Sequence, residues 1–161
     1  MALSNKTGLF DWHSVDPEIY DNPGASGLYL INFRNRRLGD PDRNRSKIQT
    51  LRTIKASRFD DLDLPVPNLI AMDVQGAELA VLQGFGAQLQ DVSAIILETC
   101  FSENYIGGSK FKDIDLWLTN ENFSFQQSTL SKNPFRKPKI TLPARFGFYS
   151  QDFNVLYTKN N

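Results

Sequence analysis

The chain has 161 residues, which suits one domain with a sizeable core. Its 18 basic and 18 acidic side chains cancel, so the overall charge does not indicate binding to nucleic acid or to an anionic membrane. Cys100 is the only cysteine, which excludes an internal disulfide and a zinc site built from several cysteines. No apolar run approaches the roughly 20 residues that a membrane helix needs, and no apolar secretory segment opens the chain. We therefore expect a cytoplasmic protein without a membrane span.

The first third of the chain predicts strands separated by turns. Residues 8–15 suggest a strand with mixed faces, and residues 28–33 form a second short apolar run. Between them, residues 21–27 have the composition of a turn, because proline fixes one backbone dihedral and glycine frees others. Residues 34–46 are polar, and we interpret them as an exposed loop or the tip of a long hairpin. Residues 48–54 alternate imperfectly between apolar and polar, which favours a strand.

The middle of the chain predicts a strand followed by a turn and a helix. Residues 58–62 suggest a single helical turn, which Pro65 and Pro67 end. Residues 68–73 are apolar on both faces, as in a central parallel strand that helices cover on each side. Residues 77–89 carry apolar side chains at three- and four-residue steps, which indicates an amphipathic helix.

The last third continues the same alternation. Residues 92–99 indicate another strand that is buried on both faces. Ser109 is a candidate N-cap for a further helix, whose apolar stripe comprises Phe111, Ile114, Trp117 and Leu118. Residues 123–127 and 152–158 indicate two final strands with only a loop between them, which implies an antiparallel edge pair. Strands that alternate with helices predict an α/β fold with a largely parallel sheet.

Residues 70–78 read Ile-Ala-Met-Asp-Val-Gln-Gly-Ala-Glu, and this run is the most specific signal in the chain. Val-Leu-Gln-Gly at 81–84 and Ile-Ile-Leu-Glu at 95–98 follow it at the expected distances. From about residue 48 onward the chain resembles the FkbM family of S-adenosyl-L-methionine (AdoMet)-dependent methyltransferases. The resemblance implies the Rossmann-like sheet of class I methyltransferases, of which the chain would hold the C-terminal half. It also implies AdoMet as cofactor and O-methylation of a sugar, glycolipid or natural-product hydroxyl.

The chain departs from this family in the part that binds the nucleoside. A glycine-rich loop after a first strand and an acidic residue for the ribose are both missing, and neither the glycines of 24–27 nor those of 84–86 lie between a strand and a helix in the right order. We therefore expect residues 1–161 to form a single partial domain that lacks the first strands of its sheet, with 16–46 and 128–150 as variable loops. The alternative is a non-catalytic remnant that acts as a binding or pairing module, through a partner chain or by self-association.

Three residues are candidates for catalysis. Asp73 would follow a strand at the carboxyl edge of the sheet, where its carboxylate could face the sulfonium, orient an acceptor hydroxyl or take its proton. A structural alternative is a turn residue that accepts backbone hydrogen bonds. Glu98 ends the next strand, so the same argument applies to it, against the alternative of an ion pair with a nearby Lys or Arg. His13 is the only histidine and a candidate general base, against the alternative of a half-buried surface residue.

The expected cofactor contacts and partners complete this prediction. By resemblance, Asp73 and Gln75 would contact AdoMet, and the methyl acceptor would be a small molecule or a glycan. Three acidic residues cluster within 60–63, but successive acids on a short turn point apart, so we expect no metal site. The basic side chains between residues 34 and 58 lack interleaved aromatic residues, so we expect no nucleic-acid partner.

Overall fold

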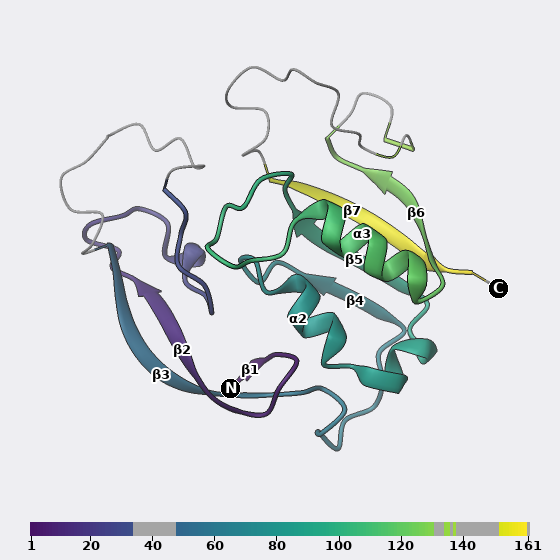
Figure 1. The fold of residues 1–161 in the computed structure, drawn as a ribbon, viewed down its shortest axis with the longest axis horizontal. Helices are drawn as coiled ribbons and strands as arrows, with labels where there is room; N and C mark the ends of the chain where they lie inside the picture. Colours follow the sequence, from purple (N-terminus) through teal and green to yellow (C-terminus); the bar gives the residue numbers. More distant parts are fainter. Residues whose placement is uncertain (34–47, 131–133, 136, 138–151, 161) are drawn as a thin grey trace.

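The computed structural model contains two β-sheets, with helices packed on the larger one (Figure 1). The residues that it describes are 1–33, 48–130, 134, 135, 137 and 152–160. The predicted loop over residues 34–46 lies outside the described residues, as does most of the loop over 128–150.

The first sheet has the strand order β1-β3-β2. Its strands are β1 (Ala2–Leu3), β2 (Gly8–Val15) and β3 (Gln49–Ser57). β1 runs parallel to β3, and β2 runs antiparallel to it over its whole length. The strands predicted over 8–15 and 48–54 are thus confirmed, although the second continues to residue 57. The apolar run at 28–33 forms no strand. Ile31 within it forms an isolated bridge with Tyr105, and Gly27 just before it forms one with His13.

The second sheet has the order β4-β5-β7-β6. It comprises β4 (Leu69–Met72), β5 (Ala94–Thr99), β6 (Phe123–Ser128) and β7 (Phe153–Lys159). β4 and β5 are parallel, whereas β7 lies between β5 and β6 and is antiparallel to both. The predicted antiparallel final pair is therefore confirmed, with β6 as the edge strand. The prediction of one largely parallel sheet is wrong, because the described strands form two sheets with one parallel pair in each. The mixed α/β arrangement agrees with a methyltransferase-like fold.

The helices on the second sheet are α2 (Glu78–Gln83) and α3 (Phe111–Asn120), and both lie on the same face of it (Figure 1). The helix predicted over 77–89 is shorter than expected. It stops at Gln83, and after Gly84 the chain continues as a 3-10 helix over Gly86–Asp91. Gly86 has φ +52°, which is outside the α-helical region, so a continuous helix cannot pass through this residue as predicted. A second short 3-10 helix, Pro23–Ala25, occupies the turn predicted at 21–27.

Apolar side chains from the helices and the second sheet make the main core. The predicted stripe of α3 is confirmed, because Phe111, Ile114 and Leu118 are buried and Trp117 packs against the same cluster. Alternate residues of β7 complete this core, since Phe153, Val155 and Tyr157 are buried. A smaller cluster joins the first sheet to the loop after β5, and it consists of Val15, Ala25, Ile31, Ile48 and Tyr105.

Three sequence-based predictions are wrong in detail. Residues 68–73 and 92–99 are not buried on both faces, because Leu69 and Ile96 are 51% and 37% exposed on the side without α2 and α3. Ser109 does not cap α3, since Lys110 occupies the N-cap position and the Ser109 hydroxyl bonds elsewhere. Residues 58–62 form a hydrogen-bonded turn, from the Leu62 N–H to the Phe59 carbonyl, rather than a helical segment.

Candidate functional site

Asp73 opens a tight turn that links the carboxyl end of β4 to the start of α2. Gln75 and Gly76 both have positive φ angles, +55° and +94°. A side chain on Gly76 would meet the Cβ of Tyr105 at 2.9 Å and the Cα of Gly108 at 3.3 Å. Glycine is thus required both by the backbone conformation and by the closeness of the loop after β5.

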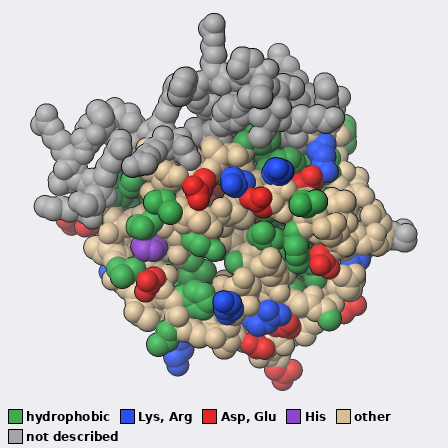
Figure 2. Space-filling model, viewed as in Figure 1, with side chains coloured by type: hydrophobic (Ala, Val, Ile, Leu, Met, Phe, Trp, Pro, Cys, Tyr) green, Lys and Arg blue, Asp and Glu red, His purple; other side chains and the backbone are tan. Residues whose placement is uncertain are grey.

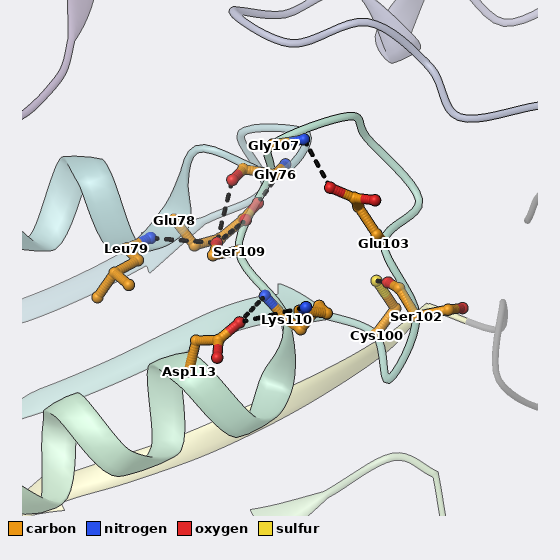
Figure 3. A network of polar contacts seen from close by, with 10 residues as sticks. All are labelled: Gly76, Glu78, Leu79, Cys100, Ser102, Glu103, Gly107, Ser109, Lys110 and Asp113. Carbon is orange, nitrogen blue, oxygen red and sulfur yellow. Dashed lines mark hydrogen bonds and ion pairs between the residues drawn. The ribbon is translucent and has the colours of Figure 1, made fainter.

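The carboxylate of Glu78 holds this turn from inside (Figure 3). Its Oε1 accepts hydrogen bonds from the backbone N–H groups of Val74 and Gly76, each at 3.2 Å. Its Oε2 accepts one from the hydroxyl of Ser109 at 3.3 Å. Glu78 is only 3% exposed, and burial raises the pKa of its carboxyl above the ordinary value, although these hydrogen bonds oppose the rise. A side chain in the first turn of a helix therefore serves here to shape the loop before that helix.

Ser109 ties the loop after β5 to the same turn. Its N–H donates to the carbonyl oxygen of Gly76 at 2.9 Å, and the single proton of its hydroxyl is shared between that carbonyl, at 3.0 Å, and Oε2 of Glu78. Figure 3 shows Ser109 between Gly76 and Glu78, so the two loops at the carboxyl ends of β4 and β5 form one hydrogen-bonded unit. Parallel strands bring such loops together because their carboxyl ends share one edge of the sheet.

Side-chain hydrogen bonds connect Asp73 to the second of these loops. The hydroxyl of Tyr105 donates to Oε1 of Gln75, and Nε2 of Gln75 donates to Oδ1 of Asp73. Asp73 itself is exposed, whereas Tyr105 is 5% exposed. The chain of contacts therefore runs from a buried phenol to an accessible carboxylate.

Asp73 and Gln75 both line a cavity of about 510 Å³. One wall is the outer edge of β4 together with α2, and the opposite wall comes from β1, β2 and the loop that follows β2. Most of the lining is apolar, with Trp12 and Met72 in it, and Ser26, Asp73 and Gln75 contribute polar side chains. Such a cavity, mainly apolar with a few polar groups at one end, is typical of small-molecule sites.

A family model described as "Methyltransferase FkbM domain" matches residues 2–125. The chain belongs to the FkbM methyltransferase family. The match includes both loops of the site, from the turn at Asp73 to the loop that holds Tyr105 and Ser109. The comparison with curated proteins found no match, and the comparison with solved structures found none either.

The two other candidate catalytic residues of this FkbM domain lie apart from the large cavity. Glu98 was expected to end its strand but is the penultimate residue of β5, and it lines a separate cavity of about 20 Å³, which shares Gln75 with the larger one. His13 lies on β2 next to Trp12, whose side chain lines the large cavity. Since successive strand residues point to opposite faces, His13 points away from that cavity. The structure thus brings Asp73 and Gln75 together and leaves His13 away from both. The functional roles of these residues and of Glu98 stay predictions.

Sequence reasoning missed the residues that support Asp73 from the loop after β5. Tyr105 lies 30 residues from its partner Gln75, and no local pattern in the sequence links the two. Ser109 was interpreted as a helix cap, although it bonds the turn at Gly76. The one local signal in the sequence is the Gln75-Gly76 pair, because glycine is compatible with a turn that needs positive φ angles.

The described residues include no group of three or more His, Cys, Asp and Glu side chains that could hold a metal ion. Over the same part of the FkbM domain, no helix is long and apolar enough to span a membrane. On the face shown in Figure 2, acidic and basic side chains are interspersed, in keeping with the balanced charge of the sequence.

Proposed function

We propose that this FkbM domain is an AdoMet-dependent O-methyltransferase that acts on a hydroxyl of a sugar, a glycolipid or a natural product. The observation that carries the proposal is the position of Asp73, an accessible carboxylate at the carboxyl end of β4 that lines the 510 Å³ cavity and is oriented by Gln75. Ligands of open α/β sheets bind at this edge. Membership of the family supports the class of reaction.

Asp73 would act on the acceptor. One of its carboxylate oxygens accepts the Gln75 amide, and the other is available to accept the hydrogen bond of an acceptor hydroxyl. When bound, AdoMet supplies a methyl group whose bond to the sulfonium sulfur breaks as its bond to the acceptor oxygen forms. Asp73 would take the hydroxyl proton, or pass it to solvent, as this oxygen loses its lone pair to the new bond. Much of the rate would come from positioning, which can supply about 7–11 kcal/mol.

The residues at this end of the cavity fit only part of the cofactor. The carboxylate of Asp73 and the amide of Gln75 are suitable neighbours for a sulfonium and its amino acid moiety. For the nucleoside, the described residues offer no glycine loop between a strand and a helix. We propose that residues outside this sequence bind the nucleoside, and that 1–161 is a single partial domain with a Rossmann-like class I sheet.

Substrate choice would then depend on the loops around the cavity. We propose that the variable loops 16–46 and 128–150 select the acceptor, because Gly24, Ser26 and Leu28 of the first loop already line the cavity. Glu98 and His13 are alternative bases in this proposal, and the protein would work in the cytoplasm.

The test is methyl transfer from radiolabelled AdoMet by the full-length gene product to a panel of hydroxyl acceptors. The variant is Asp73→Asn, which keeps the size of the side chain and its contact with Gln75 but removes the charge and the proton acceptor. We expect turnover to fall at least 100-fold with an unchanged fold, since general bases contribute about 100- to 10,000-fold. The control is Asp63→Asn, at an exposed position away from the cavity. Normal turnover by the Asp73 variant would remove the catalytic assignment.

A second candidate function rests on the outer edge of β4. Within the described residues this edge has no strand beside it, and it forms one wall of the large cavity. An open strand edge can pair with another chain, so a non-catalytic remnant could use it as a pairing module. Sedimentation velocity of the wild type and of Ala71→Lys tests this, because a lysine on the edge discourages pairing. Self-association that the substitution abolishes would favour the pairing module, and a monomer at all concentrations would count against self-pairing.

A further inference from the structure

Tyr105 contacts the candidate catalytic carboxylate only through another side chain. We propose that Tyr105 is a positioning residue, which orients Asp73 by fixing the side-chain amide of Gln75. The effect of this orientation on catalysis rests on the function proposed above. The orientation itself follows from the contacts of three residues and can be tested without turnover.

The direction of the hydrogen bonds makes Gln75 a relay. An ionised carboxylate only accepts hydrogen bonds, so Asp73 needs the NH₂ end of the amide. The hydroxyl of Tyr105 donates to the other end, the Oε1 atom of Gln75. Removal of that hydroxyl takes away the group that favours this orientation, and the amide is then free to rotate away from Asp73.

The backbone of Gln75 is held in place, which fixes the position from which its side chain extends. Its φ of +55° lies in the left-handed region, which non-glycine residues seldom adopt. The next residue, Gly76, is fixed by two hydrogen bonds from Ser109 and one to Glu78. A residue in such a conformation needs support from its surroundings, and strained positions of this kind cluster at functional sites.

Tyr105 is itself firmly placed. Its ring belongs to the smaller core cluster, with Ile31 and Ile48 among its members, and its backbone forms a bridge with Ile31. The neighbouring Ile106 N–H donates to the carbonyl of Leu30 at 2.8 Å. The loop after β5 is thus packed against the segment that follows β2, so the first sheet and the second sheet together hold the phenol.

Carbon NMR of the 161-residue chain with labelled aspartate tests the relay. The Asp73 side-chain Cγ resonance is identified by its absence from the spectrum of Asp73→Asn. We expect Tyr105→Phe to shift this resonance although Tyr105 does not touch Asp73, and Gln75→Ala to shift it as well. In the Gln75→Ala background, Tyr105→Phe should leave the Asp73 resonance unchanged, because the side chain that connects Tyr105 to Asp73 is already absent.

Tyr157→Phe is the matched control, since its buried hydroxyl donates to a different carboxylate, that of Asp115, at 2.7 Å. It should leave the Asp73 resonance in place. The proposal is overturned if Tyr105→Phe leaves the Asp73 resonance unmoved, or moves it equally with Gln75 and without it. If Tyr105→Phe does not fold, Gln75→Ala in the intact background decides, and an unmoved Asp73 resonance there overturns the proposal.

The full-length protein provides a second readout that a purely structural role would not give. Tyr105→Phe should lower kcat by roughly threefold to tenfold, the size expected for one lost hydrogen bond, with KM unchanged. An Asp73 resonance that does not respond to Tyr105→Phe would refute the relay and leave the methyltransferase proposal standing. A normal kcat in Asp73→Asn would refute the catalytic assignment and leave the relay standing.

Discussion

The carbonyl oxygen of Ser4 occupies the space that a side chain on Gly84 would need. Ser4 directly follows β1, and Gly84 directly follows α2, so this contact joins the first sheet to the helix that carries the candidate site. The two groups are 80 positions apart in the chain, and both are backbone, which leaves neither of them a rotamer with which to move aside.

Gly84→Ala should therefore destabilise the protein. We expect the free energy of unfolding in urea to fall by about 1–3 kcal/mol, the usual cost of forcing an extra carbon into a packed region. The control is Gly24→Ala, where the nearest atom to a new Cβ is Oδ1 of the Asn22 side chain at 3.2 Å, which can shift. Equal stability of the Gly84 variant and the wild type would mean that Ser4 does not lie against α2.

The buried Glu78 makes stability depend on pH. Burial raises the pKa of its carboxyl in the folded state above its ordinary value of 4.5, so the folded chain retains this proton to higher pH than the unfolded chain. As the pH rises from about 4.5 through the raised folded value, the unfolded chain releases the proton first, and the stability that Glu78 contributes falls. The nearby Tyr29 senses the same charge, since burial and then Glu78 raise the pKa of its phenol.

Glu78→Gln removes this titration and keeps a carbonyl oxygen that can accept the N–H groups of Val74 and Gly76. We expect the variant to gain stability relative to the wild type as the pH increases over that window, measured by urea unfolding at several pH values. The exposed Glu18→Gln is the control for loss of a charge without burial. A constant difference between Glu78→Gln and the wild type at all pH values would contradict the burial of an ionisable carboxyl here.

A buried and an exposed leucine of α3 allow the contribution of core packing to stability to be measured separately from that of helix propensity. Leu118 is fully buried in the main core, whereas Leu116 is 61% exposed on the same helix. Leu118→Ala should cost about 2–5 kcal/mol of unfolding free energy, because it leaves a cavity. Leu116→Ala should stay within about 0.5 kcal/mol of the wild type. Urea unfolding of both variants measures the difference, and equal losses would contradict the orientation of α3.

The strands and the apolar faces were predictable because they depend on local alternation. Residues 152–158 alternate and form a strand close to the predicted bounds, and residues 8–15, with mixed faces, do so as well. The stripe of α3 was predictable for the same reason, since its period is that of a helix. The family resemblance, based mainly on residues 70–78, is also confirmed.

Errors arose where a distant part of the chain decides the local structure. The helix over 77–89 ends early, next to a glycine that accommodates the Ser4 backbone. Ser109 has the residue type of a cap, yet the turn at Gly76 takes its hydroxyl. Both partners come from elements that sequence periodicity cannot bring together.

The candidate site divides in the same way. The place of Asp73 followed from topology, because the end of a parallel strand in an α/β sheet can be expected at a ligand-binding edge. The support from Tyr105 depends on how the loop after β5 packs against residues 28–33, and no local pattern encodes that contact.

The most direct test of the account is an isothermal calorimetric titration of AdoMet into the 161-residue chain. The proposed function places the acceptor and methyl-transfer end of the site at Asp73 and Gln75, and the nucleoside at residues outside this sequence. It predicts no measurable binding by this chain alone. Binding with a Kd in the micromolar range would contradict it, because Asp73 and its neighbours would then form a complete cofactor site without a glycine-rich loop.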